Sequence, residues 1–148
     1  MSQTEIIKKL REKTGLSVGD IKKAIDEAGN EEGAIQLLKA KGLASAEKRA
    51  SREVHEGVIS SYVHANKKLA SVVELLCETD FVAKTEEFQT MAYDIAMHVA
   101  AMKPQTEEEL LSQPFVKDGS VTIKDLINQA VARIGENIRI GKFQIFEI

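Results

Sequence analysis

Cysteine is nearly absent from this sequence, since Cys77 is the only one among its 148 residues. A single thiol excludes an intrachain disulfide and any zinc site built on several thiolates. Long apolar runs are also missing: no stretch approaches the roughly 18 residues that a membrane-spanning helix needs, and the N-terminus lacks the apolar centre of a signal peptide. The net charge of −3 gives no basic surplus for nucleic acid. We therefore expect a cytoplasmic protein with no membrane partner.

Motifs for catalysis and for nucleotide binding are missing as well. Neither glycine-rich phosphate-binding motif, G-x-x-x-x-G-K-[ST] or G-x-G-x-x-G, occurs, so we expect no direct nucleotide binding. The histidines, His55, His64 and His98, have no second ligand at helical spacing, which argues against a metal site. The pair Ser60-Ser61 lacks the glycines of a nucleophile elbow. These absences favour a protein that is not an enzyme and carries no cofactor.

The first 44 residues predict a small bundle of three helices. Ser2-x-x-Glu5 is a capping box before the first helix. A second helix is expected over Val18–Ala28, and a third is expected to begin at Asn30 and to end at Gly42, because glycine accepts the left-handed conformation that ends helices. This spacing resembles a ubiquitin-associated-type domain, and an ordinary helical bundle is the alternative.

Residues 45–54 are charged and alanine-containing, which favours a solvated linker helix. From residue 55 to residue 148 we expect an α+β core domain. Here the spacing of apolar residues changes from a period of 3.6 to a period of 2, which predicts strands over Glu56–His64 and Leu69–Cys77. We expect a hairpin loop between them, in which Asn66 takes a positive φ.

Two helices and a third strand complete the predicted core. One buried helix face runs from Phe88 to Met102, and a second helix begins at the capping box Thr122-x-x-Asp125. In the last strand the alternation slips by one residue at Gly141-Lys142, which predicts a bulge. The fold class is therefore α+β: a three-helix module followed by a three-stranded antiparallel sheet packed with helices.

The stretch from Thr79 to Ala83, between a strand and a helix, has two interpretations. In one, Asp80 caps the following helix and Phe81 packs back on it as a hydrophobic staple. In the other, Phe81 is held out for a partner, because the predicted core faces are complete without it. The pattern of residues does not decide between them.

The motif C-E-T-D-F-V-A at 77–83 resembles the signature of the translation elongation factor Ts family. Four more segments resemble that family in the same order: L-R-E-K-T-G at 10–15, E-G-V-I-S-S-Y-V-H at 56–64, L-L-S-Q-P-F-V-K-D at 110–118 and I-G-E-N-I-R-I-G-K-F at 134–143. The resemblance implies a guanine nucleotide exchange factor for elongation factor Tu. It implies that Phe81 inserts near the magnesium and phosphate region of that GTPase and promotes release of GDP.

The resemblance also implies which residues contact the partner. The contact residues expected in the core are Thr79, Asp80, Phe81 and Val82, and those expected in the N-terminal module are Arg11, Val18, Asp20 and Lys22.

The connection from Met102 to Leu110 departs from the family, whose members usually insert a longer helical segment there. Short members can pair their sheets, so we expect a non-covalent homodimer through the core sheet. A competing hypothesis is an adaptor whose N-terminal module binds ubiquitin-like or ribosome-associated partners.

Overall fold

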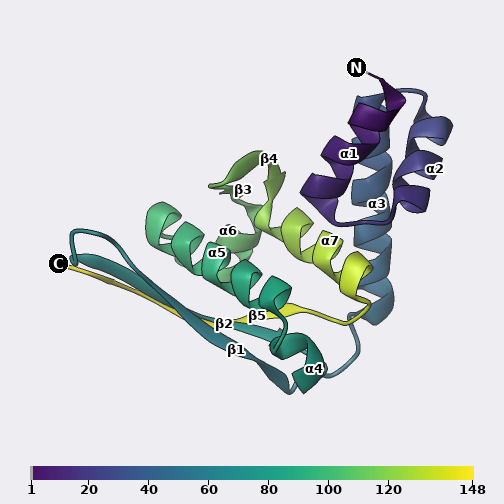
Figure 1. Cartoon of the computed structure of the whole chain (residues 1–148). Helices are drawn as coiled ribbons and strands as arrows, with labels where there is room; N and C mark the ends of the chain where they lie inside the picture. Colours follow the sequence, from purple (N-terminus) through teal and green to yellow (C-terminus); the bar gives the residue numbers. More distant parts are fainter. Residues whose placement is uncertain (1) are drawn as a thin grey trace.

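The computed structural model describes residues 2–148, which form twelve elements (Figure 1). The elements are α1 (Gln3–Thr14), α2 (Val18–Ala28), α3 (Glu31–Arg49), β1 (Glu56–Val63), β2 (Leu69–Cys77), α4 (Asp80–Ala83), α5 (Glu86–Met102), α6 (Glu107–Ser112), β3 (Pro114–Phe115), β4 (Asp118–Thr122), α7 (Ile123–Ile134) and β5 (Arg139–Glu147). The α+β fold class is confirmed.

The N-terminal module consists of α1, α2 and α3 around a small hydrophobic cluster of its own. Each helix begins at a side-chain cap: the caps are Ser2, Ser17 and Asn30, which accept from the main-chain N–H three residues later. Leu10, Ile21 and Leu38 are fully buried between the helices. The division into domains at residues 44 and 54 stays a prediction.

Helix α3 corrects two expectations, because it does not end at Gly42 and residues 45–49 are not a separate linker helix. Gly42 is buried inside α3, and a Cβ atom there would lie 3.3 Å from the main-chain carbon of Asn128 in α7. The missing side chain lets two helix backbones pack closely. That contact keeps α3 helical past Gly42 and brings Ala46 against the core cluster. The stretch is therefore covered on one side only, because Glu47, Lys48 and Ala50 are exposed.

The core sheet has the strand order β1-β2-β5 and is antiparallel throughout. The bulge in β5 is confirmed: Val73 pairs with Phe143 and Leu75 with Ile140, so that Gly141 and Lys142 together face one residue of β2. The positive φ in the hairpin belongs to Lys67 and not to Asn66. The Asn66 side chain instead accepts a hydrogen bond from the N–H of Lys68.

Helices α5 and α7 lie on one side of the core sheet (Figure 1). Among the largest fully buried side chains of this layer are Phe88, Ile95 and Val99 of α5, Ile123 of α7, and Val73 and Leu75 on the inner face of the sheet. His98 of α5 is also buried, where its Nδ1 accepts from Val116 N–H and its Nε2 lies 2.9 Å from Gln113 Oε1. Burial lowers the pKa of His98, which therefore serves the core as a neutral side chain.

The short ribbon of β3 and β4 was not predicted. Two residues form β3, which is too short for a period-2 pattern to be seen. The ribbon leads directly into α7, whose capping box between Thr122 and Asp125 is confirmed.

We predict that Gly42→Leu destabilises the protein while Ala40→Leu does not. A leucine at position 42 must separate the α3 and α7 backbones, which should lower the free energy of unfolding by about 1–3 kcal/mol. Ala40 is exposed on the same helix, so introducing leucine there should change the free energy of unfolding by no more than about 0.5 kcal/mol. Urea unfolding measures both, and equal midpoints would contradict the close contact of α3 with α7.

Candidate functional site

The single-turn helix α4 presents Phe81 to solvent, with 87% of its surface exposed. Thr79 caps this turn, since its Oγ1 accepts from Val82 N–H at 3.3 Å. Asp80 is therefore not the cap, and Phe81 is not a staple packed on the fold. The structure rules out the inward interpretation of the Thr79–Ala83 stretch.

The neighbours of Phe81 hold the turn against the fold. Ala83 is buried and Val82 packs against the core cluster. Thr85 donates from Oγ1 to the carbonyl of Val82 and caps α5 through the N–H of Phe88. Consequently α4 passes into α5 with little freedom between the two caps.

Asp80 and Lys84 form an exposed ion pair one turn apart, with 2.8 Å between Oδ2 and Nζ. The hydrogen bond to Asp80, together with its negative charge, raises the pKa of Lys84. Such exposed pairs add little to stability. The pair places one charge of each sign close in the chain to Phe81.

The four N-terminal candidate residues are on the surface of the three-helix module. Val18 is 43% exposed at the start of α2, and Asp20 lies 3.9 Å from the ammonium group of Lys41. Arg11 and Lys22 are exposed on α1 and α2. Figure 1 shows α2 and α4 at well-separated places, so the structure does not bring these residues together with Phe81.

Arg133 at the end of α7 connects the two candidate surfaces. Its Nη1 donates to the carbonyl oxygen of Thr14 at 2.7 Å, and its Nε donates to the carboxylate of Glu87 in the first turn of α5. Gly15 leaves room for this side chain, since a Cβ atom there would overlap the aliphatic part of Arg133. One guanidinium group thus ties the N-terminal module to the helix that follows Phe81.

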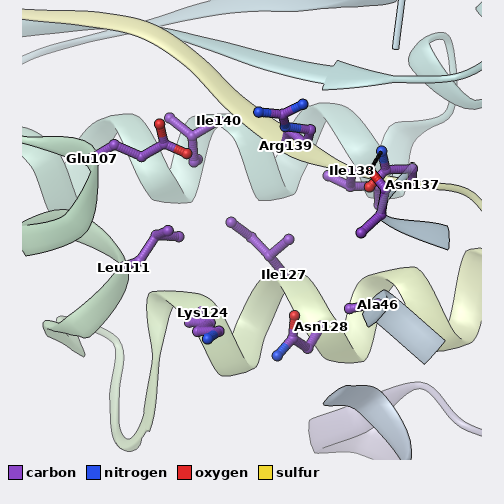
Figure 2. Close-up of a pocket in the computed structure, with 11 residues that line it drawn as sticks. Ala46, Glu107, Leu111, Lys124, Ile127, Asn128, Asn137, Ile138, Arg139 and Ile140 are labelled. Carbon is purple, nitrogen blue, oxygen red and sulfur yellow. Dashed lines mark hydrogen bonds between the residues drawn. The ribbon is translucent and has the colours of Figure 1, made fainter. Parts of the chain in front are cut away.

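A groove of about 420 Å³ lies between α3, α6, α7 and the start of β5. In Figure 2 its apolar side chains Leu111, Ile127 and Ile140 point toward one another, and charged side chains, among them Lys124, lie around them. Across residues 2–148, no three His, Cys, Asp or Glu side chains gather as metal ligands. In the same range, no helix is both long and apolar enough to cross a membrane. The residues of α4 do not line the groove.

Cys77 ends β2 directly before the Thr79–Ala83 turn and is fully buried. Burial, together with the nearby charge of Glu136, raises the pKa of the Cys77 thiol to about 11. Its Sγ donates to the carbonyl of Thr79 at 3.3 Å. A protonated, enclosed thiol is a structural group and not a nucleophile.

Two residues near the site were not singled out from the sequence: Arg133 and Glu136. They flank Gly135, which ends α7, and a pair of charges around a helix-ending glycine is the one local signal available. Their partners lie far away along the chain, at Thr14 for Arg133 and at Thr79 for Glu136. A local pattern therefore cannot reveal what they bind.

The fold and the exposed turn define a class of protein. It is a small α+β protein with a three-helix module and a solvent-exposed aromatic side chain on the turn that follows the second strand of the sheet. A family profile described as "Elongation factor TS" matches residues 78–148. Proteins named "Elongation factor Ts" are similar over nearly the whole chain. The protein of Herpetosiphon aurantiacus is 39% identical, with 96% of this chain and 95% of the relative aligned. The protein of Maridesulfovibrio salexigens is 41% identical, with 94% of this chain and 90% of the relative aligned. The protein of Thermosipho melanesiensis is 39% identical, with 100% of this chain and 99% of the relative aligned.

The chain belongs to the elongation factor Ts family. The alignments with these relatives run over more positions than the chain has residues, so each relative carries segments without a counterpart here. The connection between α5 and α6 is only residues 103–106 long. That this connection is where the relatives are longer stays a prediction.

We predict that Cys77 resists thiol reagents while the protein is folded. With a pKa of about 11, about one thiol in a thousand is ionised at pH 8, and burial blocks access to it. Ellman's reagent should therefore react slowly in buffer and rapidly in urea, where the pKa returns to about 8.5. One equivalent of reaction within the mixing time in buffer alone would show that the end of β2 is open.

Proposed function

We propose that this chain is a guanine nucleotide exchange factor for elongation factor Tu, acting in the cytoplasm to promote release of GDP. Membership of the elongation factor Ts family supports the partner. The single observation that carries the proposal is the exposure of Phe81 on a turn fixed by caps on both sides. The chain itself holds no nucleotide in this proposal and performs no chemical step.

Exchange of this kind follows from thermodynamic linkage. A factor that binds the nucleotide-free GTPase more tightly than its GDP form must weaken GDP binding by the same ratio. The proposed route is insertion of the Phe81 ring near the magnesium and phosphate region, where it favours a conformation that holds the ion and the phosphates poorly. In this proposal Thr79, Asp80 and Val82, which are neighbours of Phe81 in the chain, complete the contact.

The free energy of one buried ring limits what Phe81 can do. Burying a phenylalanine contributes about 1.5–3 kcal/mol, whereas inverting a two-state equilibrium from 1:99 to 99:1 takes about 5.5 kcal/mol. A second contact must supply the difference. We assign it to the N-terminal module, which carries the exposed residues Arg11, Val18, Asp20 and Lys22. Arg133 joins this module to Glu87 in the helix that follows α4.

We predict that Phe81→Ala lowers the acceleration of GDP release by roughly ten- to a hundredfold, the loss that corresponds to one buried ring. The measurement is release of a fluorescent GDP analogue from elongation factor Tu at increasing concentrations of this protein. Val116→Ala, which shortens another exposed apolar side chain on a different part of the surface, is the matched control. Unchanged acceleration in Phe81→Ala would contradict the proposal that the ring inserts into the GTPase, which we call the wedge mechanism. No acceleration by the intact protein would contradict the exchange function itself.

The outer face of the core sheet supports a non-covalent homodimer. Ile59 is 71% exposed on β1 and Phe146 is 52% exposed on β5, and Val63 and Val72 share their face. Helices cover only the opposite face among the described residues (Figure 1). Pairing two such faces would bury these side chains. Cys77 points into the covered face and cannot form a disulfide across the pair.

We predict that Ile59→Glu, combined with Phe146→Glu, converts a dimer to a monomer, because each chain would place two uncompensated charges inside the interface. Sedimentation velocity over a range of protein concentrations measures the state. Val116→Glu introduces a charge at an exposed apolar position outside this face and should leave the dimer intact. A wild-type protein that stays monomeric at high concentration would refute the homodimer.

A further inference from the structure

The turn after α7 binds the segment that precedes α4. The carboxylate of Glu136 accepts two main-chain hydrogen bonds on Oε1, from the N–H groups of Glu78 and Thr79, both at 3.1 Å. Its Oε2 accepts a third from the hydroxyl of Thr79 at 2.7 Å. One side chain therefore holds three donors from two consecutive residues.

The same two segments are also joined in the opposite direction. The N–H of Asn137 donates to Glu78 Oε2 at 2.5 Å, and the side-chain amide of Asn137 donates to the carbonyl of Arg52 at 2.7 Å. Arg52 in turn lies 3.7 Å from the Glu78 carboxylate. The end of β2, the end of α7 and the chain after α3 thus form one hydrogen-bonded junction.

Glu136 determines how Thr79 can act as the cap of α4. A hydroxyl group has one proton to donate and lone pairs to accept with. Because Thr79 donates its proton to Glu136, the oxygen is turned so that it accepts from Val82 N–H. The orientation of the capping oxygen, and with it the first turn of α4, follows from the position of the Glu136 carboxylate.

Helix α4 needs such an anchor. A four-residue helix is not stable alone, because nucleation of a helix is unfavourable. Phe81 contributes almost nothing to holding it, since its ring is 87% exposed. A ring that must enter a partner binds better when its direction is fixed beforehand, because less conformational freedom is lost on binding.

We propose that Glu136 is a positioning residue for nucleotide exchange, which acts by fixing Thr79 and thereby the direction of Phe81. This proposal rests on the proposed function of Phe81. It assigns Glu136 no contact with the GTPase or with nucleotide.

The first measurement does not involve the GTPase. In Glu136→Ala the N–H groups of Glu78 and Thr79 lose their acceptor, so their hydrogen exchange should speed up by about tenfold or more, the effect of removing hydrogen bonds to a charged group. The N–H groups in the middle of β2 should keep their protection. Glu136→Gln keeps one oxygen that can accept from both N–H groups and should retain most of the protection. Glu86→Ala is the control, since it removes a nearby exposed carboxylate for which the structure gives no hydrogen bond to this segment.

The second measurement is a double-mutant cycle for GDP release from elongation factor Tu. Glu136→Ala alone should lower the acceleration by about tenfold. Glu136→Ala added to Phe81→Ala should lower it by a much smaller factor, because most of the effect of Glu136 acts through the ring. A side chain that merely stabilised the fold would lower the acceleration by the same factor in both backgrounds.

The outcomes separate this proposal from the one on which it rests. Unchanged hydrogen exchange at Glu78 and Thr79 in Glu136→Ala would overturn the positioning role whatever the exchange assay gives. Equal losses in the presence and absence of Phe81 would also overturn it. If Phe81→Ala accelerates GDP release from elongation factor Tu as much as the intact protein does, the wedge mechanism is wrong. The positioning of Phe81 for exchange is then wrong as well, even if the hydrogen exchange behaves as expected.

Discussion

The packing of α7 against two separate hydrophobic clusters is the constraint on which the rest of this structure depends. Ile127 and Val131 are buried in the core cluster, while Ala132 of the same helix packs against the N-terminal cluster. A three-helix module of this size is only marginally stable through its own burial. The close approach of α3 to α7 at Gly42 therefore joins the module to the core and extends the surface that it buries.

Most ion pairs of this protein lie on its surface and contribute little to the free energy of folding. Lys9–Glu31 and Lys103–Glu147 are of this kind. Arg133 pairs with Glu87 and also donates to the main-chain carbonyl of Thr14. Glu136 accepts from the main-chain N–H groups of Glu78 and Thr79. A main-chain group has a fixed place in the backbone, so bonds of this kind determine the relative position of segments more than they add stability. Arg133 at the end of α7 and Glu136 just after it thus contribute to the geometry of the two candidate contact surfaces.

Local sequence rules predicted the elements whose causes are local. Caps and apolar periodicity gave α1, α2, α7 and the hairpin of β1 and β2, because those signals lie within a few residues of each element. The same rules were wrong at Gly42. They predicted a helix end there, but this glycine lies inside α3 and allows a close contact with Asn128 of α7, which is far away in the chain. The ribbon of β3 and β4 was missed because β3 has only two residues, too few to show an alternation of apolar and polar positions. At the candidate site, the residue pattern left Phe81 undecided between two positions, and only the packing of Val82 and Ala83 against the core shows which side faces solvent.

The energetics of the α4 turn point away from a role in folding for Phe81. Leaving a phenyl ring in water forgoes about 1.5–3 kcal/mol of burial. The turn that carries it is nevertheless held by two threonine caps and by the three hydrogen bonds of Glu136. A loop that needed only to connect β2 to α5 would require none of these for an exposed side chain, since main-chain groups at a surface can bond to water. The ordering of a turn around a side chain that gives the fold nothing is the arrangement expected of a group whose binding partner is another molecule.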